Sequence, residues 1–382
     1  MFAKGRDTRL KFDGAAVYTF APMRLPVDFW DSTGGPFSYC NMTHLVELYE
    51  AGGITGKMIC TERMAKVVLP HILTGEEKTA GEWLDIVYWQ NRNNGFNGES
   101  AYEYGRFEFL IYDILAKMAG QPLHRYLGAE KDWLYAYGSG AGTSLTDEQM
   151  TKELEGFLKD GYKTVKMKIA TNFGADLDRD IRRIALAREV IGPDIGLAID
   201  ANQYFQAEAA LEFIERAAKY QIEWFEEPVH CCDFEGLDWL SKRSPVPIAM
   251  GESMRNHYMF REYLRCGVKH FQPCPSNMAG IREWMEIRDM AKENQITLTS
   301  GGLPYMASAL IATADETARQ EYLAPVEDMQ REFLSVKWEI KDGRFILPDI
   351  PGMPFVVDLD YMRKKCLILR KDYYYPSTAL RK

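Results

Sequence analysis

The sequence predicts an α/β fold in which parallel strands alternate with helices and close into a TIM-like barrel. Short apolar runs end in charged residues, as in TVKMK, GLAID and WFEE. Three of the acids, Asp200, Glu226 and Glu252, lie 26 residues apart and then 26 again, an interval that suits one strand, one helix and two loops. Amphipathic segments such as DEQMTKELEGFLKDG separate several of the runs, and this alternation favours a parallel sheet.

The region before the barrel has a different pattern. Residues 1 to about 40 are rich in aromatic residues, Gly, Pro and Asp, and are expected to be irregular. THLVELYEAGGITGKMICT predicts a β-hairpin with its turn at Gly52 and Gly53. From Lys66 to Leu127 the spacing of apolar residues is helical, with a stop at Gly120.

The barrel is expected to begin near Leu134. Its predicted strands are WLYAYGS, TVKMKI, GLAIDA, EWFEEPV, VPIAMGE, KHFQPC, ITLTSG and finally EYLAP, which contains Glu321. The tail starts like a hairpin, at WEIKDGRFILPDIPG. The basic and aromatic end, RKDYYYPSTALRK, is expected to be a subunit contact or a loose terminus.

Composition narrows the class of protein. A chain of 382 residues can hold a barrel of about 200–250 residues and a second domain. A net charge of −9 argues against nucleic acid or an anionic membrane as a partner. Apolar runs are too short for a membrane span or a signal peptide. The seven cysteines form no CxxC motif, so a reduced, cytoplasmic protein is expected.

The charged residues at the strand ends predict a metal site with a nearby base. Three acids at the ends of three consecutive strands converge at one rim of a barrel, and they repel one another unless a cation lies between them. Oxygen ligands at this density favour Mg²⁺. Lys166 and Lys168 are two residues apart, so both point to one face of a strand. A lysine close to a second ammonium group and a dication loses its proton more easily and can act as a base.

The run KMK, DAN, EEP and GE resembles the enolase superfamily, specifically its mandelate racemase and muconate lactonizing branch. The resemblance extends from about residue 40 to about residue 325. It implies a (β/α)₇β barrel (131–335) and an α+β capping domain, formed by the N-terminal region (1–130) with the C-terminal tail (336–382) packed back on it. It also implies a small-molecule carboxylate substrate and a homo-oligomer.

The resemblance assigns roles residue by residue. Asp200, Glu226 and Glu252 match the metal ligands, Lys168 matches the catalytic base, and Lys166 matches the lysine that contacts the substrate carboxylate. Further substrate contacts are expected from the polar neighbours and the capping loops: Asn202, Glu321, Cys274, Trp30, Tyr39, His44 and Lys57. His270 is expected in the core.

The departures from the family pattern concern the face opposite the lysines. Cys274 stands where the racemase group has an Asp, and Gly301 stands where it has a His. Gln272 stands where other groups have a sixth-strand lysine. One clear base therefore remains. A single base fits a β-elimination better than a racemisation. The resemblance, in which acid-sugar dehydration is the commonest activity of this motif set, then implies abstraction of the proton alpha to a carboxylate through an enediolate and dehydration of an acid sugar to a 2-keto-3-deoxy acid.

Three alternatives remain open at this stage. In the dehydratase reading, the leaving hydroxyl is protonated by the lysine or by a capping residue such as His44 or Tyr39. An epimerase or racemase, or a cycloisomerase, is an alternative if Cys274 or a capping residue serves as the second group. The last alternative is a metal-binding protein without turnover.

Overall fold

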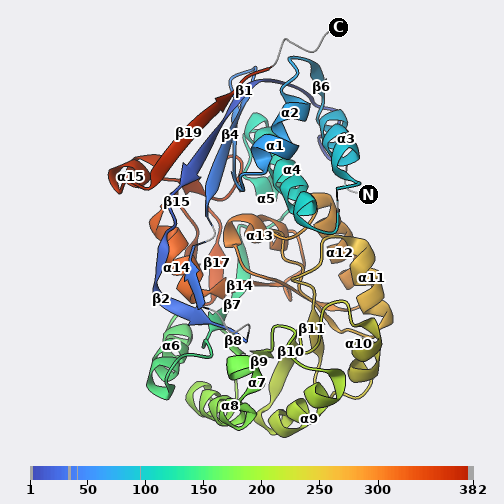
Figure 1. Ribbon diagram of the computed structural model, residues 1–382, viewed down its shortest axis with the longest axis vertical. Helices are drawn as coiled ribbons and strands as arrows, with labels where there is room; N and C mark the ends of the chain where they lie inside the picture. Colours follow the sequence, from blue (N-terminus) through green and yellow to red (C-terminus); the bar gives the residue numbers. More distant parts are fainter. Residues whose placement is uncertain (1–2, 33–35, 41, 95, 377–382) are drawn as a thin grey trace.

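The computed structural model describes residues 3–32, 36–40, 42–94 and 96–376. Its centre is a closed parallel barrel in which the first strand also pairs with the last (Figure 1). In chain order the barrel strands are β7 (Trp133–Gly140), β8 (Thr164–Lys168), β9 (Gly196–Asp200), β10 (Ile222–Glu226), β11 (Ile248–Met250), β12 (His270–Phe271), β13 (Thr297–Ser300) and β14 (Arg319–Leu323). The predicted barrel is therefore confirmed.

Helices surround the barrel and connect its strands (Figure 1). They are α6 (Asp147–Lys159), α7 (Thr171–Gly174), α8 (Leu177–Ile191), α9 (Ala207–Ala217), the 3₁₀ turn η1 (Ala218–Tyr220), α10 (Phe234–Ser241), α11 (His257–Arg265), α12 (Ile281–Glu293), α13 (Pro304–Ile311) and α14 (Ala324–Glu332). α6 begins at a capping box, in which Thr146 accepts from the backbone N–H of Gln149 and the Gln149 side chain accepts from that of Thr146.

The cap above the barrel combines a sheet with helices (Figure 1). The sheet has the order β19-β1-β4-β5, and β6 also pairs with β1. Its strands are β1 (Arg9–Phe20), β4 (His44–Glu50), β5 (Thr55–Cys60), β6 (Glu77–Thr79) and β19 (Ile368–Tyr374). The helices are α1 (Met64–Val67), α2 (Leu69–Ile72), α3 (Ala80–Asn91), α4 (Glu99–Met118) and α5 (Leu123–Tyr126). The predicted hairpin is confirmed as β4 and β5.

Two expectations about the ends of the cap are wrong. Residues 1 to about 40 are not irregular, because they contain β1, a strand of 12 residues at the centre of the sheet. The second half of β1 is buried almost continuously, so it lacks the alternation by which a strand is recognised. As far as Tyr374, the C-terminal end is not a loose terminus, because β19 pairs with β1. The other expectation for this end, a subunit contact, stays a prediction. Residues 377–382 lie outside the described part of the chain.

The tail is shared between the two parts of the molecule. Its hairpin-like start is confirmed as β16 (Glu339–Lys341) and β17 (Arg344–Ile346), and β17 pairs with the first residues of β7 in the barrel. β15 (Leu334–Val336) and β18 (Val356–Val357) form a separate pair, followed by α15 (Leu359–Lys364). Of the tail strands in the described part of the chain, β19 alone joins the cap sheet.

The cap meets the barrel from two sides. On one side α4 packs so closely that a Cβ at Gly105 would lie 2.2 Å from the carbonyl oxygen of Met278, so glycine is required there. On the other side the hairpin of β2 (Arg24–Trp30) and β3 (Pro36–Tyr39) contacts α14. Beyond β2, the hydroxyl of Ser32 donates to the carbonyl of Ala201 at the end of β9, at 2.8 Å.

Candidate active site in the barrel mouth

The barrel interior changes from apolar to charged along the direction of its strands. Tyr137, Ala198, Trp224 and Ala249 form a buried cluster contributed by four strands. Two residues further along two of these strands, Ala198 is followed by Asp200 and Trp224 by Glu226. Side chains alternate along a strand, so these acids lie on the same inner face as the apolar cluster, closer to the strand ends.

Lys166 joins three of the predicted acids. Its ammonium group lies 2.5 Å from Glu226 Oε1, 2.8 Å from Glu321 Oε1 and 3.4 Å from Asp200 Oδ2. Burial lowers the pKa of Lys166, but Glu226 and Glu321 outweigh this effect and hold the pKa well above its usual value. Lys166 is therefore a fixed positive charge at the centre of the cluster.

Lys168 lies at the end of β8. Among the described residues, its one carboxylate partner within ion-pair distance is Asp200, whose Oδ2 lies 2.5 Å away. Burial lowers the pKa of Lys168, and Asp200 raises it by more. The buried guanidinium of Arg183 donates to the carbonyl of Lys168 at 2.9 Å and also to that of Ala141 at 2.8 Å. Arg183 thus fixes the backbone that carries the predicted base.

The acids differ in their surroundings. Burial raises the pKa of Asp200, but Lys168 and Lys166 hold it below its usual value. Burial, and then Asp200, raise the pKa of Glu226 to about 8. The second oxygen of Glu226 accepts from Trp224 Nε1 at 3.1 Å and from Gln272 Nε2 at 2.7 Å.

Glu252 and Asn202 complete the predicted polar rim. Glu252 is the partly exposed member of the acid set, and burial followed by Asp200 raises its pKa. The backbone N–H of Asn202 donates to Asp200 Oδ1 at 2.9 Å. Asn202 has a φ of 42°, a conformation that is costly outside glycine and is concentrated at functional sites.

The donor set fits a hard dication. Asp200, Glu226, Glu252 and Glu321 carry four formal negative charges and the two lysines carry two positive ones, which leaves −2. Buried oxygens of three neighbouring side chains have no hydrogen-bond partner among the described residues, namely Asn202 Oδ1, Glu227 Oε1 and Gln272 Oε1. Carboxylate and amide oxygens are the ligands that Mg²⁺ takes in proteins.

Among the residues that the structure describes, the face opposite the lysines carries no strong base. In the closed ring β12 lies four strands from β8, which places it across the barrel. Cys274, just after β12, is buried, and its thiol lies 3.1 Å from Ser276 Oγ. Burial raises the pKa of Cys274 to about 12. A Cβ at Gly301 would lie 3.3 Å from Cys274 Cβ and 3.6 Å from Glu252 Cβ, so the two departures from the family pattern are neighbours.

The capping candidates lie outside the charged cluster. Tyr39 is exposed on β3, and the Nδ1 atom of His44 lies 3.0 Å from its neighbour Thr43 Oγ1. Lys57 pairs with Glu47 on the cap sheet at 2.9 Å. Trp30 accepts a backbone hydrogen bond from Thr143, which anchors the hairpin to the barrel. The roles of these side chains in substrate contact stay predictions.

Sequence reasoning missed several residues that support the site. Ser32 and Arg183 act through backbone carbonyls that are distant in sequence, so no local pattern marks them. Gln203 and Glu227 directly follow the DAN and EEP motifs, and the amide of Gln203 donates to Glu227 Oε2 at 3.0 Å. Their adjacency to the motifs is the one signal that could have revealed them. His270 is buried against Thr299, as expected of a core residue.

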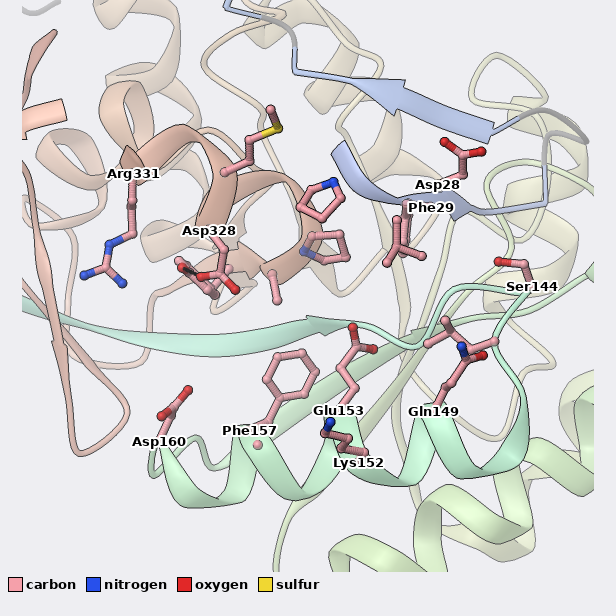
Figure 2. A pocket seen from close by; sticks show the side chains of 18 of the residues that line it. Asp28, Phe29, Ser144, Gln149, Lys152, Glu153, Phe157, Asp160, Asp328 and Arg331 are labelled. Atoms are coloured by element: carbon pink, nitrogen blue, oxygen red, sulfur yellow. Dashed lines mark hydrogen bonds between the residues drawn. The ribbon is translucent and has the colours of Figure 1, made fainter. Parts of the chain in front are cut away.

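A separate cavity of about 650 Å³ lies outside the barrel, between α6, α14 and β2. Figure 2 shows Glu153 and Phe157 on α6, Asp328 on α14, and Asp28 and Phe29 on β2 around this space. Within the described part of the chain, its lining includes none of the lysines and acids of the barrel mouth. This cavity is therefore distinct from the cluster of lysines and acids in the barrel mouth.

Residues 149–361 match the family described as enolase C-terminal domain-like, and the chain belongs to this family. Its relatives include the arabinonate dehydratase of Saccharolobus solfataricus, 28% identical over 76% of this chain and 79% of that one. The L-talarate/galactarate dehydratase of Salmonella typhimurium is 26% identical over 77% of this chain and 72% of that one. The D-galactarolactone cycloisomerase of Agrobacterium fabrum is 26% identical over 72% of this chain and 76% of that one. The predicted superfamily is confirmed.

Solved structures agree on the fold. The Salmonella typhimurium dehydratase, crystallised with Mg and L-lyxarohydroxamate, has a TM-score of 0.84 at 22% identity and covers 98% of this chain and 97% of its own. A racemase from Streptomyces coelicolor with bound magnesium has a TM-score of 0.81 at 22% identity and covers 93% of this chain and 99% of its own. In the described residues, every helix is too short or too polar to cross a membrane.

Proposed function

We propose that this protein removes the proton alpha to the carboxylate of an acid sugar in a Mg²⁺-dependent reaction, and that it releases a 2-keto-3-deoxy acid. Asp200, Glu226 and Glu252 would hold the ion. A bound Mg²⁺ would supply positive charge beside the substrate carboxylate and so stabilise the negative charge that builds there. The relatives that dehydrate acid sugars support the substrate class.

The observation that carries this proposal is the asymmetry between the two lysines. Lys166 is surrounded by three carboxylates, whereas Lys168 pairs with Asp200 alone among the described residues. Lys166 is suited to hold the substrate carboxylate as a permanent cation, with Glu321 keeping it in place. Lys168 lies nearer the strand end. An ion held by Asp200 would take away the carboxylate that raises the pKa of Lys168 and add positive charge beside it, which would suit Lys168 to take the proton.

The dehydration balances with these groups and needs no redox partner. Lys168 takes the proton from C2, the electron pair of that C–H bond forms the C2–C3 double bond, and the C3–O bond breaks. The departing oxygen receives a proton, which protonated Lys168 can return, and leaves as water. The enol that remains rearranges to the 2-keto-3-deoxy acid.

An epimerase or a cycloisomerase is the second candidate, and cycloisomerases among the relatives favour it. It would require a second group across from Lys168, and Cys274 is the side chain in that position. Cys274→Ser distinguishes the two, because a one-base dehydratase keeps most of its turnover and a two-base epimerase loses it.

The test is an incubation with Mg²⁺, D₂O and a panel of aldonic and aldaric acids, followed by NMR and a keto-acid assay. A 2-keto-3-deoxy product supports dehydration. Deuterium at C2 without a keto product contradicts dehydration and supports epimerisation. Absence of both across the panel, with Mg²⁺ bound, points to a metal-binding protein without turnover.

A further inference from the structure

The loop between β10 and α10 gathers a second group of metal-binding side chains. His230, Cys231 and Cys232 each offer one ligand atom, and these atoms lie within 4.8 Å of one another. His230 and Cys232 are exposed, Cys231 is half-buried, and both thiols are free. None of these residues takes part in the reaction proposed above.

The separation of the two sulfur atoms suits a tetrahedral metal ion. Cys231 Sγ and Cys232 Sγ are 3.8 Å apart. Two sulfur ligands at about 2.3 Å from a tetrahedral Zn²⁺ are about 3.8 Å from each other. A nitrogen and a sulfur ligand on the same ion are about 3.6 Å apart by the same geometry. Because the three ligand atoms lie within 4.8 Å of one another, the exposed ring of His230 needs to move by at most about 1.2 Å to reach that spacing.

The backbone of the loop is already held in place. The N–H of Cys231 donates to Gln203 Oε1 and its carbonyl accepts from Tyr263 Oη, both at 2.9 Å. The N–H of Cys232 donates to His230 Nδ1 at 3.2 Å. This bond turns the ring toward the loop and occupies the Nδ1 lone pair, so Nδ1 would have to exchange it for the ion. A ligand set fixed before binding loses less conformational freedom when the ion arrives.

We propose that His230, Cys231 and Cys232 form a second metal site, which binds a thiophilic divalent ion such as Zn²⁺ with a fourth position open to water. The soft donors separate this site from the carboxylates of the barrel mouth, because thiolate and imidazole select Zn²⁺ and carboxylates select Mg²⁺. Burial raises the pKa of Cys231 to about 12, so binding of the ion to this thiol releases its proton.

The experiment uses the reduced full-length protein with saturating Mg²⁺, so that the carboxylate site is filled with its own ion. Cd²⁺ is titrated while the ultraviolet band from thiolate to Cd²⁺ charge transfer is followed, and Zn²⁺ affinity is measured against a chromophoric chelator. We expect one equivalent of Cd²⁺ with the thiolate band and one equivalent of Zn²⁺ that competes with it.

Cys232→Ser changes an exposed side chain and is expected to weaken Zn²⁺ binding by roughly tenfold or more. Cys366→Ser removes an exposed thiol on the cap, away from this loop, and is the matched control with unchanged affinity. The proposal is overturned if the Cd²⁺ band is absent, if Cys232→Ser binds Zn²⁺ as tightly as the parent, or if Cys366→Ser loses binding. No substrate is used, so the result is independent of the proposed activity.

Discussion

Replacement of Glu226 by Gln tests the ligand set of the barrel mouth directly. Free Mg²⁺ at 100 times its dissociation constant stabilises the folded protein by about 2.7 kcal/mol. The unfolding entropy of a 382-residue chain is about 0.8 kcal/mol per kelvin near 60 °C. The parent protein should therefore gain about 3 °C in melting temperature.

In Glu226→Gln the amide can still accept from Trp224 and Gln272, but the formal charge of the cluster falls from −2 to −1 because one carboxylate is lost. If the affinity for Mg²⁺ falls about 100-fold, the same Mg²⁺ concentration stabilises the variant by only about 0.4 kcal/mol. Its melting temperature then rises by about 0.5 °C. Differential scanning fluorimetry with and without Mg²⁺, checked by calorimetric titration, measures the difference.

The neighbouring residue provides the control. Glu227 is also buried, and Gln203 holds its Oε2 while its Oε1 has no partner among the described residues. If Glu226 is the ligand as proposed, Glu227→Gln should keep a shift close to 3 °C. A full Mg²⁺ shift in Glu226→Gln would refute the ligand assignment. Loss of the shift in Glu227→Gln alone would move the ligand to that residue.

Three further predictions concern the base, the cap and pH. Lys168→Ala should lower kcat by about 10²–10⁴ with the Mg²⁺ shift intact, and unchanged turnover would remove Lys168 as the base. Ser32→Ala loses the hydrogen bond to the Ala201 carbonyl, worth about 1 kcal/mol. If this bond positions the end of the β2 segment for substrate binding, KM should rise roughly fivefold with little change in kcat. An unchanged KM would show that the bond has no such role. Burial raises the pKa of Glu108 to about 7, so its stabilising neutral form is lost as pH rises from about 4.5 to 7, at a cost of roughly 3 kcal/mol. The melting temperature of Glu108→Gln should fall less over this range, and identical pH profiles would contradict the shift.

The strand ends could be predicted because their chemistry is local. Each barrel strand combines a short apolar run with a charged end, and a regular interval brings Asp200, Glu226 and Glu252 to one rim whatever the loops do. The second half of β1 lacks a strand pattern, because a segment buried on both faces loses its alternation. The bond from Ser32 to Ala201 spans 169 residues, and only the folded chain determines it.

The two departures at the barrel mouth act together on the reaction. Cys274 and Gly301 come from adjacent strands, and a side chain at position 301 would be in contact with both Cys274 and Glu252. The buried Cys274 thiol, with its raised pKa, offers neither a charge nor a ready base, and Gly301 offers no side chain. Lys168 on β8 would therefore work without a second base at these two strand ends, and the reaction proposed here is accordingly an elimination and not a transfer of the proton between faces.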